Sequence, residues 1–405
     1  MHHGLNLIAL LTVALTVWVW SVAAPRLERW NITGPIFFVT AGLLLANLND
    51  GVGSLDARGA GIRELAEVAL AIVLFSGAAI VPVRALRRDA GLPVRLLGLG
   101  LPLTMAAGAL AARALFPDLS WWICALIGAA VAPTDAALGA AIMEDQRVPN
   151  RVRRALNVES GLNDGIVTPF VSFFIVAAIA VDSTASVSRG EAVADLLIGA
   201  VCGIVVGVLG GWLLARSGAE NDSVSRNLGA AALGLISYAA AVEMGANGFV
   251  AAFVAGLAYG WAELRGEENF VDKTLTLCHQ GGELMSFIVW FLFGAVMVPE
   301  LVSMGGKDVA FALLALSILR MVPVWLVTRG LGLDRATVGI IGWFGPRGLA
   351  SVVFALLAFD DLAPPEGQRV VVTITTTVLA SVLLHGISAA PIAQRYASMR
   401  KPVAS

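Results

Sequence analysis

The sequence of 405 residues is 58% hydrophobic and only 14% charged, with a formal net charge of −2 at pH 7. Soluble globular domains carry about 25% charged residues. The composition therefore excludes an ordinary soluble domain and predicts a protein that crosses a membrane many times. The near-zero net charge gives no indication of nucleic-acid binding.

Hydropathy over a window of about 19 residues predicts thirteen membrane spans. We interpret the first as a retained helix rather than a signal peptide, because no Lys or Arg precedes it. The second is short for a helix that needs about 20 residues to cross a bilayer. The predicted spans are 5–24, 34–48, 64–82, 94–116, 120–142, 158–181, 191–215, 226–243, 246–261, 280–298, 306–328, 334–358 and 370–393.

The distribution of basic residues predicts the orientation of these spans. If the N-terminus lies outside, most of the 27 Lys and Arg residues fall in loops on the inner side. Because inner loops of membrane proteins are enriched in Lys and Arg, we expect the N-terminus outside and the C-terminus in the cytoplasm. We expect the protein in the cell (inner or plasma) membrane.

Two predicted spans carry, at mid-membrane, a helix-breaking proline that is followed by a charged residue. The fifth includes Pro133-Thr134-Asp135, and the twelfth includes Gly345-Pro346-Arg347-Gly348. Proline lacks a backbone donor and clashes with the preceding turn, so backbone polar groups are freed there. Within a membrane such groups are tolerated only where protein or water meets them. We expect the Asp after one break and the Arg after the other to neutralise the half-helix ends.

The positions of these breaks indicate an internal repeat. If the seventh span is a linker, the other spans form two six-helix halves in which the fifth and twelfth spans are equivalent. A displacement by seven spans inverts one half relative to the other, as in many secondary transporters. The sequence thus predicts an all-α polytopic membrane protein with two inverted six-helix repeats and two crossing broken helices.

The sixth span begins with polar residues that an apolar helix would not need. Glu159, Ser160, Asn163 and Asp164 open an apolar run that continues to Val181. A charge at the bilayer centre costs roughly 2.5–3.5 kcal/mol on insertion scales, so such residues usually line an ion path or have a partner. Small hard cations prefer carboxylate, amide and hydroxyl oxygens. We therefore predict a cation site around Asp164.

The charges within the spans predict the stoichiometry of exchange. Asp135, Glu159 and Asp164 oppose Arg320 and Arg347, which leaves one negative charge uncompensated. One proton or one monovalent cation can neutralise that charge, and the two compete for it. If both forms can cross the membrane, the result is one-for-one, electroneutral antiport.

Three motifs in span order carry a resemblance to a known family. Pro133-Thr134-Asp135, Glu159-Ser160-x-x-Asn163-Asp164 and Gly345-Pro346-Arg347-Gly348 resemble those of bacterial and archaeal sodium/proton antiporters of the cation:proton antiporter-1 family. These proteins are related to animal sodium/hydrogen exchangers, and the resemblance covers nearly the whole chain. It implies a homodimer embedded in lipid that works by an elevator-type mechanism and contributes to pH homeostasis.

The resemblance also implies a division of the chain and an ion site. Residues 91–185 and 305–395 would form the mobile core, and residues 1–90 and 190–300 the dimer and interface part. No cofactor is implied beyond the transported Na⁺, Li⁺ or K⁺ and H⁺. The implied ion- and proton-binding residues are Asp164, Asp135, Asn163, Ser160 and Thr134, and Na⁺ would be held by Asp164, Asp135, Ser160 and Thr134.

Further residues match structural positions of the family. Glu159 and Arg320 match a salt bridge in the core, and Arg347 matches the arginine that compensates charge at the second broken helix. Asn163 matches the residue that accompanies electroneutral exchange. Ser76 departs from the pattern, because many relatives carry an acid there.

Other functions fit part of the pattern. Two intramembrane aspartates also describe an intramembrane aspartyl protease, but no Gly-x-Gly-Asp element surrounds Asp135 or Asp164. A passive cation channel would favour a repeated pore element over two inverted broken helices. Potassium/proton exchange stays open, because sequence does not report cavity size. We interpret His385 and His279 as interfacial residues rather than pH sensors.

Overall fold

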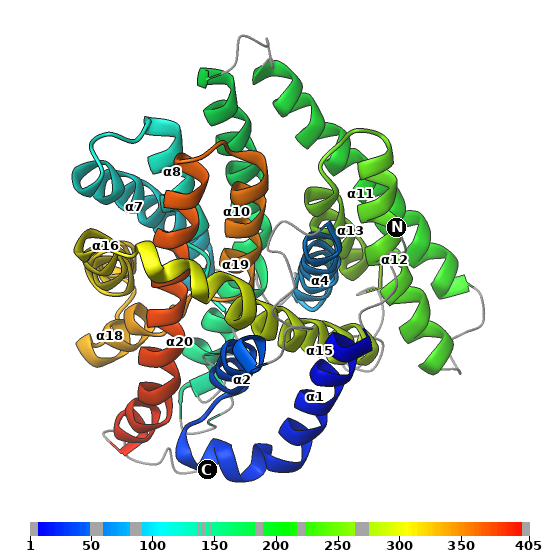
Figure 1. The fold of residues 1–405 in the computed structure, drawn as a ribbon. Helices are drawn as coiled ribbons and strands as arrows, with labels where there is room; N and C mark the ends of the chain where they lie inside the picture. The colour runs from blue at the N-terminus through cyan, green and yellow to red at the C-terminus, as the bar shows by residue number, and fades with distance from the viewer. Residues whose placement is uncertain are drawn as a thin grey trace.

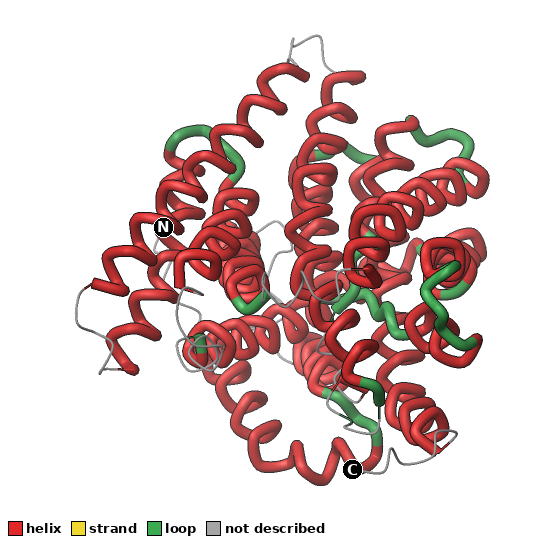
Figure 2. The backbone as a smooth tube through the Cα atoms, turned by 180° about the vertical axis from the view of Figure 1, so that it is seen from behind, coloured by secondary structure: helices red, strands yellow, loops and turns green. Residues whose placement is uncertain are grey.

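A computed structural model describes residues 7–48, 60–81, 91–135, 138, 142–143, 145, 148–182, 189–216, 223–263 and 275–398. All regular secondary structure in these residues is helical (Figures 1 and 2). The predicted all-α fold class is therefore confirmed.

The N-terminal half consists of helices α1 to α10. Residues 91–115 form one continuous helix, in which a π-helical turn joins α6 to α7. The elements of this half are α1 (Leu7–Leu27), η1 (Glu28–Trp30), α2 (Gly34–Leu48), α4 (Ala60–Ala79), α6 (Gly91–Arg95), η2 (Leu96–Gly100), α7 (Leu101–Leu115), α8 (Trp121–Ala130) and α10 (Asn150–Asp182).

The C-terminal half continues the helical pattern. Its elements are α11 (Arg189–Arg216), α12 (Ser223–Glu243), α13 (Gly248–Glu263), α15 (Thr276–Leu292), η4 (Phe293–Met297), η5 (Val298–Ser303), α16 (Gly306–Leu316), α17 (Ile318–Thr328), α18 (Arg335–Trp343), α19 (Leu349–Asp361) and α20 (Glu366–Ser398).

Helix length and composition identify a multi-pass membrane protein. Among the described residues, 7 helices are long and apolar enough to cross a membrane. Shorter apolar helices lie at Gly34–Leu45, Trp121–Ala130 and Gly248–Ala262. The predicted count of thirteen spans is not decided by these criteria and stays a prediction.

The helices form two groups that lie side by side (Figure 1). In one group α4, α11, α12 and α13 pack together, and α15 packs on α2 and α4. In the other group α7, α8, α10 and α16 to α20 pack together. Helices α10 and α19 contact α4 and so lie at the boundary. The predicted division into core and interface parts stays a prediction, and its limits at residues 90 and 185 lie outside the described residues.

The largest buried apolar cluster surrounds the interrupted helices. It draws residues from α4, α8, α10, α15, α19 and α20. Every residue of α19 from Leu349 to Ala358 is buried. A helix that is apolar on all sides belongs in the interior of the protein, so α19 is a central helix and not a lipid-facing one.

Both predicted breaks are present in the fold. Helix α8 ends at Ala130 and is followed by irregular residues 131–135. Helix α18 ends at Trp343, and residues 344–348 are irregular before α19 begins. In each case the proline within the segment cannot supply the helical hydrogen bond. The remainder of the predicted fifth span, 136–142, lies largely outside the described residues.

An unpredicted break divides the eleventh predicted span. Ser317 has φ −121° and ψ −94° between α16 and α17, so the helix is interrupted there. This interruption frees the carbonyl of Ala315, which a buried arginine then uses, as described below.

Candidate ion-binding site

The two broken helices cross and bond to each other through their backbones. The Asp135 N–H donates to the Pro346 carbonyl across 2.8 Å. The Leu349 N–H, in the first turn of α19, donates to Asp135 Oδ2 across 3.0 Å. A Cβ atom at Gly348 would overlap the Asp135 carboxylate, so the close approach requires glycine there. Each break thus supplies the hydrogen-bond partners that the other has lost.

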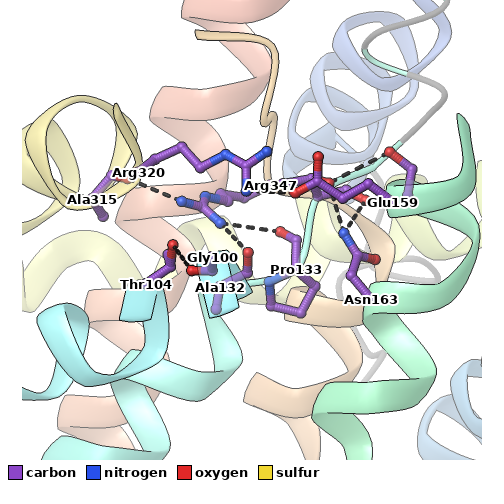
Figure 3. Close-up of polar contacts among 11 residues, drawn as sticks. Gly100, Thr104, Ala132, Pro133, Glu159, Asn163, Ala315, Arg320 and Arg347 are labelled. Atoms are coloured by element: carbon purple, nitrogen blue, oxygen red, sulfur yellow. Dashed lines mark hydrogen bonds and ion pairs between the residues drawn. The ribbon is translucent and has the colours of Figure 1, made fainter. Parts of the chain in front are cut away.

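Arg347 fills the space on the other side of the crossing. Its side chain is fully buried and donates through Nη1 to the carbonyls of Ala132 and Pro133. Its Nη2 donates across 3.0 Å to the carbonyl of Ala315, which the break at Ser317 has freed. Figure 3 shows the guanidinium group between these carbonyls. A single cation therefore satisfies carbonyls from two interrupted helices.

The charged side chain of each break lies at the helix end that borders the other break. Asp135 belongs to the first break but lies at the N-terminus of α19, and Arg347 belongs to the second break but lies at the C-terminal end of α8. Helix N-termini carry partial positive charge and C-termini partial negative charge. The signs therefore match in both places, and the crossing is held by electrostatics as well as by hydrogen bonds.

Asn163 connects α10 to the first break. It is fully buried, and its Nδ2 donates to Thr134 Oγ1 across 2.6 Å and to the Thr134 carbonyl across 3.2 Å. Ser160 Oγ lies 3.4 Å from Thr134 Oγ1. Because Nδ2 is the donor in both bonds, Asn163 Oδ1 remains as an acceptor, and it has no partner among the described residues.

Asp164 follows Asn163 on α10 and is partly exposed. Because Asn163 bonds to Thr134, Asp164 and Asp135 each directly follow a residue of this contact along the chain. Within the described residues, no group of three His, Cys, Asp or Glu side chains could hold a metal ion. Two carboxylates beside hydroxyl and amide oxygens form a donor set of low charge, which suits a monovalent cation or a proton.

A buried ion pair stands beside the site. Arg320 Nη1 lies 2.6 Å from Glu159 Oε1, and each side chain is only 1% exposed (Figure 3). A Cβ atom at Gly345 would lie 2.7 Å from Arg320 Nε and 3.1 Å from Thr134 Cγ2. The ion pair therefore packs directly against the second break and is not a surface contact.

The structure differs from our sequence interpretation at α20. His385 was expected at the membrane interface, but it is fully buried and contacts the end of α18. Ser381, which the sequence analysis did not single out, accepts the backbone N–H of Arg347. The spacing of Ser381, His385 and Ser388 in an apolar helix was the available signal. Ser76, by contrast, is buried on α4 and donates to the Val73 carbonyl of its own helix.

Residues 10–395 match the family described as "Sodium/hydrogen exchanger, transmembrane". The chain belongs to this family. The match includes every residue of the crossing and of the ion pair.

Relatives within this family are named either as Na(+)/H(+) antiporters or as K(+)/H(+) antiporters. The chain is 30% identical over 305 residues to the Na(+)/H(+) antiporter NhaP of Pseudomonas aeruginosa, covering 69% of this chain and 68% of that one. It is 28% identical over 387 residues to the K(+)/H(+) antiporter NhaP2 of Shewanella sp. (strain ANA-3). That match covers 93% of this chain but only 64% of the longer relative.

The fold is shared with a solved structure. The sodium proton antiporter MjNhaP1 from Methanocaldococcus jannaschii superimposes with a TM-score of 0.76 at 19% identity, over 96% of this chain and 99% of that one. The resemblance stated from the motifs is therefore confirmed at the level of family and fold.

Proposed function

We propose that this protein is a secondary transporter that exchanges a monovalent cation for a proton at Asp164. The observation that carries the proposal is the crossing of two broken helices at Asp135, next to the Asn163–Asp164 segment of α10, where Asn163 bonds to Thr134. Charged groups inside membrane proteins occur chiefly on ion and proton pathways. Discontinuous helices at mid-membrane are the usual setting of transporter ion sites.

The donor atoms favour a dehydrated monovalent cation. Asp164 supplies the exchangeable charge, and Asp135, Ser160 and Thr134 supply further oxygens. Asn163 Oδ1 adds a neutral acceptor without a partner among the described residues. Arg347 and the pair of Glu159 with Arg320 balance the remaining charges within the core. One proton therefore replaces one cation, and the exchange is electroneutral.

Sodium or lithium is the proposed cation, and potassium is the alternative. The potassium alternative is favoured by relatives whose names describe K(+)/H(+) antiporters. The sodium proposal is favoured by the relative named Na(+)/H(+) antiporter, which is the more similar of the two over the aligned residues. Ions of different radius require different cavity size and ligand number, so a transport assay decides.

Alternating access is proposed to occur by an elevator-type movement. The group of α7, α8, α10 and α16 to α20 would move against the group that contains α4 and α11 to α13. In this scheme the N-terminus lies outside and the C-terminus in the cytoplasm of the cell membrane, and exchange contributes to pH homeostasis.

A homodimer is proposed from exposed apolar surface. Only 11% of the apolar window of α1 and 22% of that of α11 are buried in the single chain. Lipid or a second copy must therefore cover these helices.

The deciding experiment measures proton movement in proteoliposomes that carry an imposed pH gradient. Na⁺, Li⁺ or K⁺ is added in turn, with the membrane potential clamped or free. Dissipation by Na⁺ or Li⁺ that is independent of voltage supports the proposal. Dissipation by K⁺ alone establishes the alternative. Absence of cation-dependent proton movement under every condition refutes antiport. A cation channel or an intramembrane aspartyl protease would then be the functions to test.

A further inference from the structure

One face of α20 holds both ends of the second break. Ser381, His385 and Ser388 are spaced by four and then three residues, so they lie on the same side of the helix. Ser388 Oγ accepts the indole N–H of Trp343 across 3.1 Å. His385 Nε2 lies 2.9 Å from the Trp343 carbonyl, and Ser381 Oγ accepts the Arg347 N–H across 2.6 Å.

The two residues that α20 holds would be bonded to each other in an uninterrupted helix. There, the Arg347 N–H would donate to the Trp343 carbonyl four residues earlier. The break removes this bond, although the Gly345 N–H still donates to the Trp343 carbonyl across 2.8 Å. The side chains of Ser381 and His385 lie between the separated donor and acceptor.

Hydrogen-bond roles require a hydrogen on one nitrogen of the imidazole. A carbonyl can only accept, so His385 Nε2 must carry a hydrogen toward Trp343. Nδ1 lies 3.2 Å from Ser381 Oγ and 3.1 Å from the Ser381 carbonyl. Of these two groups only the hydroxyl can donate to Nδ1 in a neutral ring. The bridge runs from the Arg347 N–H to the Ser381 hydroxyl and from His385 Nε2–H to the Trp343 carbonyl, and the two side chains meet at His385 Nδ1.

We propose that His385 is a positioning residue for the cation site. Together with Ser381 it replaces the lost helical bond by a side-chain bridge and so fixes the distance between Trp343 and Arg347. This segment also carries the Pro346 carbonyl, which accepts the Asp135 N–H. Loss of the bridge therefore displaces Asp135 and weakens cation binding. The inference rests on the proposed function, because it assigns a role toward that same site.

The ring stacks against the residue that it holds. The His385 and Trp343 rings have centroids 5.1 Å apart. A glutamine at this position can donate an amide N–H to the Trp343 carbonyl and accept from Ser381, whereas methionine fills similar volume without a donor. The two substitutions therefore separate hydrogen bonding from packing.

The test compares His385→Met and His385→Gln in purified protein reconstituted in proteoliposomes. We expect His385→Met to raise the apparent KM for the exchanged cation about tenfold, because a buried carbonyl loses a donor. Vmax should stay within about twofold of the wild type. His385→Gln should restore KM. His279→Met is the matched control, since His279 is exposed on α15 and should change neither constant.

Ser381 provides an independent test of the bridge. Ser381→Ala removes the middle of the bridge with little change in side-chain volume. This variant should also raise the KM for the cation. It tests the proposal even if His385→Met does not fold. An unchanged KM in a folded His385→Met or Ser381→Ala variant overturns the proposal, as does a folded His385→Gln variant that behaves like His385→Met.

Nitrogen NMR of the labelled histidines separates this inference from the proposed function. The resonances that disappear in His385→Gln should show hydrogen on Nε2. This result is expected even if the wild type moves no protons. Hydrogen on Nδ1 alone contradicts the bridge.

Discussion

The backbone N–H of Asp135 donates to the carbonyl of Pro346 across 2.8 Å, although the two residues belong to opposite halves of the chain. Each proline break leaves backbone groups that hydrocarbon could not solvate. The bond shows that each break finds its partner in the other. A displacement of either segment must therefore move both, and this couples Asp135 to the twelfth predicted span.

Replacement of Asp164 by asparagine should abolish cation/proton exchange. The change removes the titrating group at nearly constant volume, so the protein should still fold. The measurement is cation-driven proton movement in proteoliposomes, with size-exclusion elution as the control for folding. Full activity in Asp164→Asn would remove this residue from the proposed mechanism.

Proton and cation should compete for one site. If they do, acidification should raise the apparent KM for the cation by about tenfold per pH unit on the acidic side of the profile, because one proton displaces one cation. Vmax should change much less. Initial rates at several cation concentrations between pH 5 and 9 would show this pattern, whereas a KM that is constant over this range excludes a shared site.

Glu159→Ala should chiefly reduce stability. It leaves Arg320 buried without its counter-ion, and removal of one partner of a buried pair costs about 3–5 kcal/mol. Thermal unfolding in detergent should show the loss, and the double substitution Glu159→Leu with Arg320→Met should recover much of it. A single variant that melts like the wild type but binds cation poorly would instead assign Glu159 to the ion site.

Gly348→Ala should impair transport more than folding. The added methyl group would overlap the Asp135 carboxylate and push it from the N-terminus of α19. We expect at least a tenfold loss of kcat/KM. Gly339→Ala is the matched control, because a Cβ atom at Gly339 meets no atom within 4 Å. Equal activity of the two variants would show that the close approach at Gly348 is not needed.

An ion-pair network tests the proposed division of the chain. Arg63 on α4 lies 3.0 Å from Asp361 and 3.5 Å from Asp360, both at the end of α19. If α19 moves against α4, these contacts must break in every cycle. Arg63→Gln should then raise turnover by up to about fivefold at low salt, the range expected for partly exposed pairs when opening is rate-limiting.

Controls for this prediction come from the same network. The charge exchange Arg63→Asp with Asp361→Arg should return turnover toward the wild-type value. Tyr238 donates to Glu67 across 2.6 Å, and both residues belong to the α4 and α12 side of the boundary. Tyr238→Phe should therefore leave turnover unchanged. An Arg63→Gln variant with wild-type turnover at every ionic strength would count against relative movement at this contact.

Much of the fold could be predicted because its signals are local. Pro133 and Pro346 mark the interrupted helices, and the predicted span at 34–48 coincides with α2. Helix α10 begins at Asn150, before the predicted start at residue 158, because its first turns are helical but too polar for a hydropathy window. Hydropathy detects burial in lipid and not helix formation in water.

The details of the site were less accessible, because they depend on contacts between distant segments. The segment around Ser317 contains no proline or glycine, so nothing in the sequence signals the helix interruption there. Asp135 lies at the N-terminus of α19 and Arg347 at the C-terminal end of α8. These positions could not be predicted without knowing how α8 and α19 are placed relative to each other. His385 was misjudged, because a histidine in an apolar run fits either an interface or a buried bond to a freed carbonyl.

The crossing also bears on how the protein is made. Arg347 follows Ala132, whose carbonyl it caps, by 215 residues. At about 5–20 residues per second, synthesis of that interval takes roughly 10–40 s. During this time the first broken helix is already within reach of the insertion machinery, and the carbonyls of Ala132 and Pro133 lack the arginine that caps them. These carbonyls therefore need water or another protein group as a partner until Arg347 has been synthesised.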